Sequence, residues 1–282
     1  MKNYLLLFVA SILFFVSAPY LNGQTKLKAE EIITKHLASI APAEKLASVK
    51  SFIAVGEVRV EYITQKNQPA SGRIVIASEG KKSFFGMQLN AADYSQEKFI
   101  FDGNKLDIGM VRPGNRSVLG SFIQSNGLMV SQGLFSGSLS TAWALLSSAE
   151  GGYKVSSPGN KKIDGKEVYS IKFSPKGTSD VVITMYFDGQ TFQHVRTEYM
   201  RTSSASIGRT IDESARQTET RFKLTEDFSE FKEHEGMTVP SKYRIHYSVS
   251  GVGGTTEISW TSSFSEFAIN QPLDPGTFAI SK

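Results

Sequence analysis

The chain has 282 residues, of which 40% are hydrophobic and 21% charged, with no cysteine and a formal net charge of +4 at pH 7. The lack of cysteine excludes disulfide bonds, thiolate zinc sites, a thiol nucleophile and the acylated cysteine of a lipoprotein. Acidic and basic residues are interspersed and the net charge is mild, which excludes the basic patch typical of nucleic-acid-binding proteins.

The first 23 residues have the parts of a secretory signal peptide. Lys2 gives a positive start, an apolar run extends from Leu5 to Val16, and small or neutral residues lead to a cleavage site after Gly23. A retained anchor is the alternative, but the apolar run is shorter than the roughly 20 residues that a membrane span needs. We therefore expect residues 24–282 to form a single-domain, soluble and monomeric protein in the periplasm.

Residues 27–49 follow the period of an amphipathic helix. One apolar stripe contains Leu27, Ile32, Ile33, His36, Leu37 and Ile40. Pro42 lacks a backbone N–H and interrupts the pattern, so we expect a second short helix over residues 43–49. The stripe predicts that the N-terminal helix packs against a sheet.

After Lys50 the apolar period changes to two, as in a half-buried antiparallel strand. The predicted strands cover residues 52–62, 72–78, 82–89, 98–101, 104–111, 166–173, 181–187, 191–200, 219–225, 237–248 and 255–262. Turn pairs such as Asp102-Gly103 and Asp188-Gly189 separate several of them. Short strands with such turns indicate one open antiparallel sheet or barrel, so we expect a mainly β (α+β) fold.

The predicted sheet is apolar on one face and polar on the other. The apolar face carries Val181, Ile183, Met185, Phe187, Tyr243, Ile245, Tyr247 and Val249, and the polar face carries Arg196, Glu198, Lys242, Arg244 and His246. Because an apolar sheet face must be covered, we expect the N-terminal helix and one further segment to cover it.

That further segment is residues 117–149, which contain no charged residue. Glycines weaken a continuous helix here, so the segment does not have the pattern of a membrane span. Helical spacing occurs in two separate groups, Leu119, Phe122 and Ile123, and then Leu139, Ala142, Trp143 and Leu146. We predict two or three short helices, with Ser138 or Ser140 as a cap. Two alternatives stay open: a fixed helical layer that closes the core, or a movable lid over an apolar cavity.

Residues 202–218 are polar and rich in serine. We interpret them as a long surface loop or an extended hairpin tip, which is either functional or an irrelevant solvated insertion.

The sequence offers no recognisable catalytic or metal-binding motif. The histidines, His36, His194, His234 and His246, lack a tight ligand spacing, and no nucleophile elbow or phosphate-binding glycine loop occurs. Paired carboxylates such as Glu226 and Asp227 are interpreted as helix-start or loop charges. We therefore expect a protein that is not an enzyme and has no catalytic residue, metal or cofactor.

The order of these elements resembles that of the periplasmic LolA/LolB-like superfamily of outer-membrane lipoprotein carriers. The stretches that carry the resemblance are AEEIITKHLASIAPAEKLASVKSF at 29–52, FDGNKL at 101–106, KIDGKEVYSIKF at 162–173, MYFDGQTFQHVR at 185–196, FSEFKEHEGMTVPSKYRI at 228–245 and NQPLDPGTFAI at 270–280. The most distinctive element has Phe228 and Phe231 before Glu235-Gly236, with Val239-Pro240 leading into a strand. This chain is longer than the best-studied carriers, with an enlarged helical insert.

The resemblance implies an unclosed β-barrel, formed by a curved antiparallel sheet, with helices that cap a hydrophobic cavity. The expected function is that of a carrier or binding protein for lipid, lipoprotein acyl chains or another hydrophobic ligand, with transient membrane contact and no nucleic-acid partner. The candidate residues of the cavity and lid are Phe85, Met87, Phe99, Phe101, Leu119, Phe122, Met129, Phe135, Trp143, Met185 and Phe187. The alternative is a module of the same fold that binds an envelope protein or senses envelope stress without transporting lipid.

Overall fold

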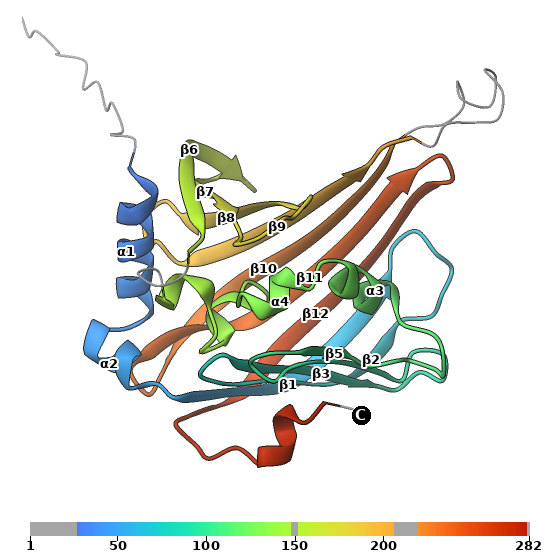
Figure 1. Ribbon diagram of the computed structural model, residues 1–282, viewed down its shortest axis with the longest axis horizontal. Coiled ribbons are helices and arrows are strands. Elements are labelled where there is room, and N and C mark those ends of the chain that lie inside the picture. Colours follow the sequence, from blue (N-terminus) through green and yellow to red (C-terminus); the bar gives the residue numbers. More distant parts are fainter. Residues whose placement is uncertain (1–26, 148–151, 206–218, 281–282) are drawn as a thin grey trace, which may run out of the picture.

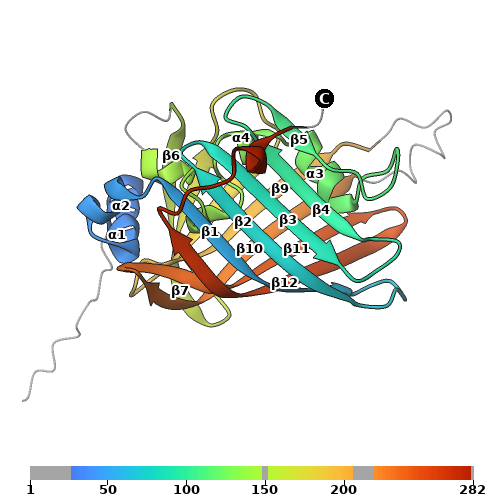
Figure 2. The same cartoon turned by 90° about the horizontal axis from the view of Figure 1, so that it is seen from below.

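A computed structural model describes residues 27–147, 152–205 and 219–280. In these residues twelve strands form one antiparallel sheet, in the order β5-β4-β3-β2-β1-β12-β11-β10-β9-β8-β7-β6. Two meanders, β1 to β5 and β6 to β12, meet where β1 pairs with β12. The edges β5 and β6 do not pair with each other, so the curved sheet is not closed (Figures 1 and 2). The mainly β fold predicted from the sequence is confirmed.

The strands run over these bounds: β1 Ser51–Tyr62, β2 Ala70–Glu79, β3 Lys82–Leu89, β4 Gln96–Phe101, β5 Leu106–Ile108, β6 Lys154–Ile163, β7 Lys166–Ser174, β8 Val182–Asp188, β9 His194–Ser203, β10 Thr220–His234, β11 Met237–Gly251 and β12 Gly254–Ile269. A short 3₁₀ turn, η3 (Pro275–Phe278), follows the last strand. The predicted alternation is visible in β8, where Ile183, Met185 and Phe187 are at most 2% exposed.

Two helices stand at one end of the sheet, α1 (Ala29–Ile40) and α2 (Ala43–Ser48), on the left of Figure 1. The buried face of α1 includes Ile32, Ile33 and Ile40, as the apolar stripe predicted. Ala41 is extended, with φ −167° and ψ 166°, because a following proline crowds the helical conformation. Pro42 thus separates two helices that meet at an angle.

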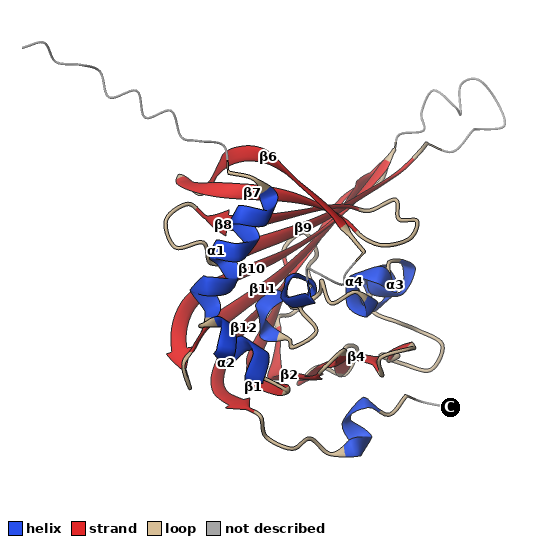
Figure 3. Cartoon of the chain, turned by 60° about the vertical axis from the view of Figure 1, so that its left-hand side comes forward, coloured by secondary structure: helices blue, strands red, loops and turns tan. Residues whose placement is uncertain are grey.

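The uncharged segment lies inside the curve of the sheet, between the β1–β5 half and the β9–β12 half (Figures 1 and 3). Its described part, residues 117–147, is named the insert below. It contains α3 (Val118–Ser125), α4 (Leu128–Ser131) and two 3₁₀ turns, η1 (Gly137–Leu139) and η2 (Ala144–Ser147). Most of its large side chains are buried, and Leu119, Ile123, Leu134, Leu139 and Leu145 have no exposed surface; Val118 and Leu146 are exposed. The insert therefore fills the concave face as part of the core.

The helix predicted around Trp143 is wrong in detail. Trp143 lies between η1 and η2, and Ser140 is extended, with φ −140° and ψ 138°. The chain turns sharply before this point: a Cβ added to Gly133, at φ +67°, would lie 1.6 Å from the carbonyl oxygen of Ala142. This close backbone approach, which only glycine allows, replaces helical winding.

Strand β6 is an element that the sequence pattern did not predict. It forms one edge of the sheet and carries Pro158 and Gly159 within a register shift against β7. Proline is tolerated in such edge strands, and their largely exposed residues do not alternate in polarity. Two other predictions, the signal peptide at 1–23 and most of the loop at 202–218, lie outside the described residues, as do residues 148 and 149.

Candidate functional site

A cavity of about 630 Å³ lies between the two N-terminal helices and the insert, and we name it the α1–α2 cavity. One wall is built by α1, α2 and their junction, with Leu37, Ile40 and Leu46. The volume is within the range of small-molecule sites, roughly 300 to 1,000 Å³.

The insert supplies the opposite wall of this cavity, and two strands supply its inner end. Ser138, Ser140, Thr141, Trp143 and Leu146 line it from the insert, and Phe52 and Met237 line it from β1 and β11. Each lining residue in the described part of the chain is uncharged. Leu146 is 37% exposed, so the cavity opens to solvent beside it. The site is an open apolar space with three hydroxyl-bearing residues on the insert wall and one, Thr34, on α1.

Trp143 is held in this wall by a histidine of α1. Its indole Nε1–H donates to His36 Nε2 at 3.3 Å, and His36 Nδ1 lies 3.0 Å from the carbonyl oxygen of Phe192. Burial lowers the pKa of His36 to about 4, so the ring is neutral at pH 7. The neutral tautomer that accepts from Trp143 and donates to Phe192 satisfies both contacts. Trp143 also stacks on His194, with ring centroids 4.9 Å apart.

Two glutamates of the sheet are buried beside the insert. Glu226 of β10 is 0% exposed and Glu97 of β4 is 2% exposed. Burial raises the pKa of each carboxyl to about 7. The interpretation of Glu226 as a loop or helix-start charge is wrong, because it lies on the inner face of β10 between the buried Leu224 and Phe228. Its position in the apolar phase of that strand was the signal available in the sequence.

The eleven candidate residues are all buried, at 6% exposure or less, and belong to the core: Phe85, Met87, Phe99, Phe101, Leu119, Phe122, Met129, Phe135, Trp143, Met185 and Phe187. Of these, only Trp143 lines the α1–α2 cavity. Phe135 of the insert packs edge-on against Phe85 and Phe99, with centroids 5.1 and 5.8 Å apart. The space left among these three rings is about 10 Å³, which is room for at most about one water molecule. A ligand role stays a prediction for all eleven.

Sequence reasoning missed the α1–α2 wall of the cavity. The apolar stripe of α1 was expected to pack against the sheet, and Leu37 and Ile40 of that stripe also line the open space. The available signal was the run of small residues on both sides of Pro42: Ala38, Ala41, Ala43 and Ala47. Small side chains at a helix break leave room that large ones would fill.

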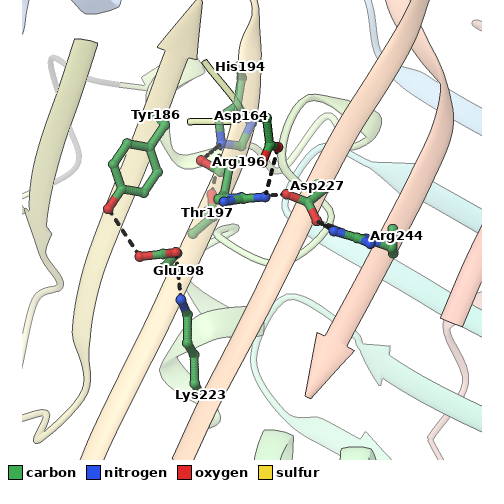
Figure 4. Close-up of polar contacts among 9 residues, drawn as sticks. All are labelled: Asp164, Tyr186, His194, Arg196, Thr197, Glu198, Lys223, Asp227 and Arg244. Atoms are coloured by element: carbon green, nitrogen blue, oxygen red, sulfur yellow. Dashed lines mark hydrogen bonds and ion pairs between the residues drawn. The ribbon is translucent and has the colours of Figure 1, made fainter. Parts of the chain in front are cut away.

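The outer face of the sheet has the opposite chemistry (Figure 4). Asp227 lies between Arg196, whose Nε is 2.5 Å from Oδ1, and Arg244, whose Nη2 is 2.7 Å from Oδ2. Glu198 accepts from Lys223 Nζ at 2.8 Å and from the hydroxyl of Tyr186 at 3.1 Å. A groove of about 590 Å³ there is lined by both acidic and basic residues. Opposite charges already pair in this groove, so it lacks the uncharged lining of the α1–α2 cavity.

Neither a protein-family model nor a curated protein matches the chain. Among solved structures, similarity extends to a LolA superfamily protein from Nitrosomonas europaea, at 14% identity over 90% of this chain and 98% of that one, with a TM-score of 0.48. A DUF1329 family protein from Desulfovibrio piger follows at 11% identity, 89% and 96% coverage and a TM-score of 0.46. A putative outer membrane lipoprotein-sorting protein domain from Vibrio parahaemolyticus has 10% identity, 88% and 94% coverage and a TM-score of 0.45.

A LolA superfamily protein and a putative lipoprotein-sorting domain, the group that the sequence resembles, are thus among the matched structures. In the described ranges of the chain, no helix is both long and apolar enough to cross a membrane.

Proposed function

We propose that the protein is an exported, periplasmic carrier or binding protein for lipid, lipoprotein acyl chains or another hydrophobic ligand, which it holds in the α1–α2 cavity. The observation that carries the proposal is this cavity of about 630 Å³, lined by uncharged residues. Burial of an acyl chain contributes about 0.8 kcal/mol per CH₂ group, so an apolar cavity suffices for affinity. Such a function needs no catalytic residue, metal or cofactor.

The lining favours a neutral ligand over an ionised one. A buried carboxylate without a cationic partner loses its hydration at a large cost, and the cavity lining carries no cation. Ser138, Ser140 and Thr141 line the insert wall, and the Thr141 hydroxyl already donates to the carbonyl oxygen of Gly80. The hydroxyl groups of the two serines can donate to the carbonyl oxygen of an ester or amide. We therefore expect an acyl ester to bind more tightly than the free fatty acid of equal length.

Two neighbouring residues of α2 provide a test of the site. Ala47 lines the cavity, whereas Ser48 beside it does not, and both are exposed. Delipidated wild-type protein is titrated with a fluorescent monoacylglycerol. We expect saturable binding that Ala47→Trp weakens at least tenfold by filling the cavity and that Ser48→Trp leaves unchanged. Binding that does not saturate, or equal affinity in both variants, overturns the proposal.

The alternative module, which binds an envelope protein or senses stress, differs in what the native protein carries. Organic extracts of protein purified from its native envelope are analysed by mass spectrometry. The carrier proposal predicts a stoichiometric neutral acyl lipid in the extract. A stoichiometric protein partner without extractable lipid would instead support the module.

A further inference from the structure

The insert carries no charge, yet two of its polar attachments to the sheet use buried acidic groups. At its start, the Ser117 hydroxyl donates to Glu97 Oε2 at 2.5 Å. Near its middle, the backbone N–H of Ser136 donates to Glu226 Oε1 at 2.8 Å. The two carboxyls therefore hold the two ends of segment 117–136, which contains α3 and α4.

Glu226 is surrounded by donors from three elements. The hydroxyl of Tyr199 on β9 donates to Oε2 at 2.7 Å, and the hydroxyl of Tyr243 on β11 donates to Oε1. The Ser136 amide on the insert completes the set. Ser136 has a φ of +68°, a left-handed conformation that is uncommon for a residue other than glycine. The contact with Glu226 thus coincides with a strained point of the insert backbone.

Glu97 is less fully satisfied. Its Oε2 accepts from the hydroxyls of Tyr94 and Ser117, and Tyr94 in turn accepts from Trp260 Nε1 at 3.0 Å. Its Oε1 is buried without a hydrogen-bond partner. A Cβ added to Gly120 of α3 would lie 3.1 Å from this atom, so the first turn of the insert covers the unpartnered oxygen. An unpartnered buried oxygen is costly when charged and much less so when it carries a proton.

We propose that Glu97 and Glu226 form a double clamp on segment 117–136, so that release of this segment from the concave face is coupled to loss of a proton from each carboxyl. The proposal concerns movement of the insert and does not depend on whether a ligand binds in the α1–α2 cavity. The clamped segment covers apolar surface: Phe122 packs on Tyr247 with centroids 5.4 Å apart, and Phe135 covers Phe85 and Phe99. Release would expose these rings as a second apolar surface.

The sign of the coupling follows from the two states of the carboxyls. With the segment in place, burial raises the pKa of each to about 7. In a released, hydrated state each returns to its ordinary value of about 4.3. The clamped state therefore binds the two protons more tightly. Acid therefore favours the clamped state. The equilibrium constant for release of the segment rises by up to about tenfold per pH unit for each carboxyl as the pH increases toward 7.

The titratable groups around Glu97 and Glu226 do not oppose a release that increases with pH. Tyr94 is the titratable neighbour of Glu97, and Tyr199, Tyr243 and Asp227 are those of Glu226; the insert adds no charge. Burial raises the pKa of the three tyrosines well above its ordinary value, so they stay neutral. His36 and His194 contact Trp143, beyond the clamped segment. Burial lowers the pKa of both, so a movement that hydrated them would be favoured by acid, the opposite sign.

Hydrogen exchange of the ligand-free, full chain tests the clamp. Protection factors, which correct for the pH dependence of intrinsic exchange, are measured for residues 118–131 between pH 5 and 7.5, with β1 and β12 as internal references. We expect the protection of 118–131 to fall at least tenfold relative to the references. Glu97→Gln and Glu226→Gln place a side chain that cannot ionise at each position. In each variant the protection of residues 118–131 should fall less with pH than in the wild type. Glu233→Gln, on an exposed position of β10, is the matched control and should leave it intact.

Protection that is independent of pH, or that falls toward acid, overturns the clamp, as does an unchanged fall in both Gln variants. If a Gln variant does not fold, the wild-type series alone decides the sign. Because no ligand is present in this experiment, its failure is distinguishable from a failure of lipid binding.

Discussion

Two adjacent carboxylates on opposite faces of β10, Glu226 and Asp227, have different kinds of partner. Glu226 points inward, to two tyrosine hydroxyls and a backbone amide of the insert, with no cation beside it. Asp227, the next residue, points outward and is shared by Arg196 and Arg244 (Figure 4). The outer carboxylate forms ion pairs with two guanidinium groups and is partly exposed to solvent. The inner carboxyl has no cationic partner, and burial raises its pKa to about 7. Its protonation therefore depends on whether the insert covers it.

The inner and outer faces also differ in the cavity and the groove that they form. The α1–α2 cavity is lined by uncharged residues, whereas the outer-face groove contains acidic and basic groups that pair with one another. A hydrophobic ligand gains free energy only where it replaces water on apolar surface. The inner side of the sheet is thus the side that we assign to ligand binding and to movement of the insert.

The largest difference between the faces should appear in packing. Phe85 points inward, is 3% exposed and stacks on Phe99 at a centroid distance of 5.3 Å. Its neighbour Phe84 lies over Gly86 in a second groove of the outer face, which β2, β3 and β4 form. We expect Phe85→Ala to lower the free energy of unfolding by about 4 kcal/mol, as for a buried Phe, and Phe84→Ala by about 1 kcal/mol. Urea denaturation measures both, and equal losses would contradict the inside–outside assignment.

A smaller effect should appear in the pH dependence of stability. Burial raises the pKa of Glu226 to about 7, above its unfolded value of about 4.3. Its contribution to stability is therefore fully present below pH 4.3 and is lost as the pH rises through 7. The free energy of unfolding of the wild type should fall by about 3 kcal/mol relative to that of Glu226→Gln between pH 4.5 and 7.5, since one pKa unit corresponds to about 1.4 kcal/mol. Taking the difference between the two proteins cancels the opposite contribution of the buried histidines.

A stability difference between wild type and Glu226→Gln that stays flat from pH 4.5 to 7.5 would contradict this account of the inner face.

The smallest effect should come from salt. Asp227→Asn leaves Arg196 and Arg244 facing each other, and we expect a loss of about 1 kcal/mol at low ionic strength. Because salt screens the repulsion between two partly exposed guanidinium groups, the deficit should shrink toward zero in 1 M NaCl. A deficit that grows with salt would mean that the pair contributes through packing instead of charge.

The sequence predicted the elements whose side chains alternate between core and solvent. The bounds of β3 and the break at Pro42 agree with the structure, because period and proline act locally. Strand β6 escaped prediction because it lies at an exposed edge, where no apolar face imposes alternation. The path of the insert around Trp143 escaped because close approach of Gly133 to Ala142 is a tertiary constraint that helical spacing does not encode.

An apolar cavity was expected from the sequence, but the residues that line the α1–α2 cavity were, apart from Trp143, not the predicted ones. The described part of the uncharged segment, residues 117–147, is mostly buried, and the choice between a fixed layer and a movable lid stays open; Trp143 of this segment lines the α1–α2 cavity. The buried carboxyls could not be matched to their partners from sequence, since Glu226 and Ser136 are 90 residues apart. Periodicity identifies which side chains face inward, whereas the space left between them depends on how distant segments pack.

The assignment of the α1–α2 cavity as the ligand site is tested most directly by photolabelling. Delipidated protein is incubated with an acyl ester that carries a photoreactive group at the end of its chain, and labelled peptides are identified by mass spectrometry. We predict saturable labelling of α1–α2 and of the insert wall around Trp143, displaced by unlabelled monoacylglycerol. Labelling that does not saturate, or that falls on the outer-face groove around Arg196 and Arg244, would contradict it.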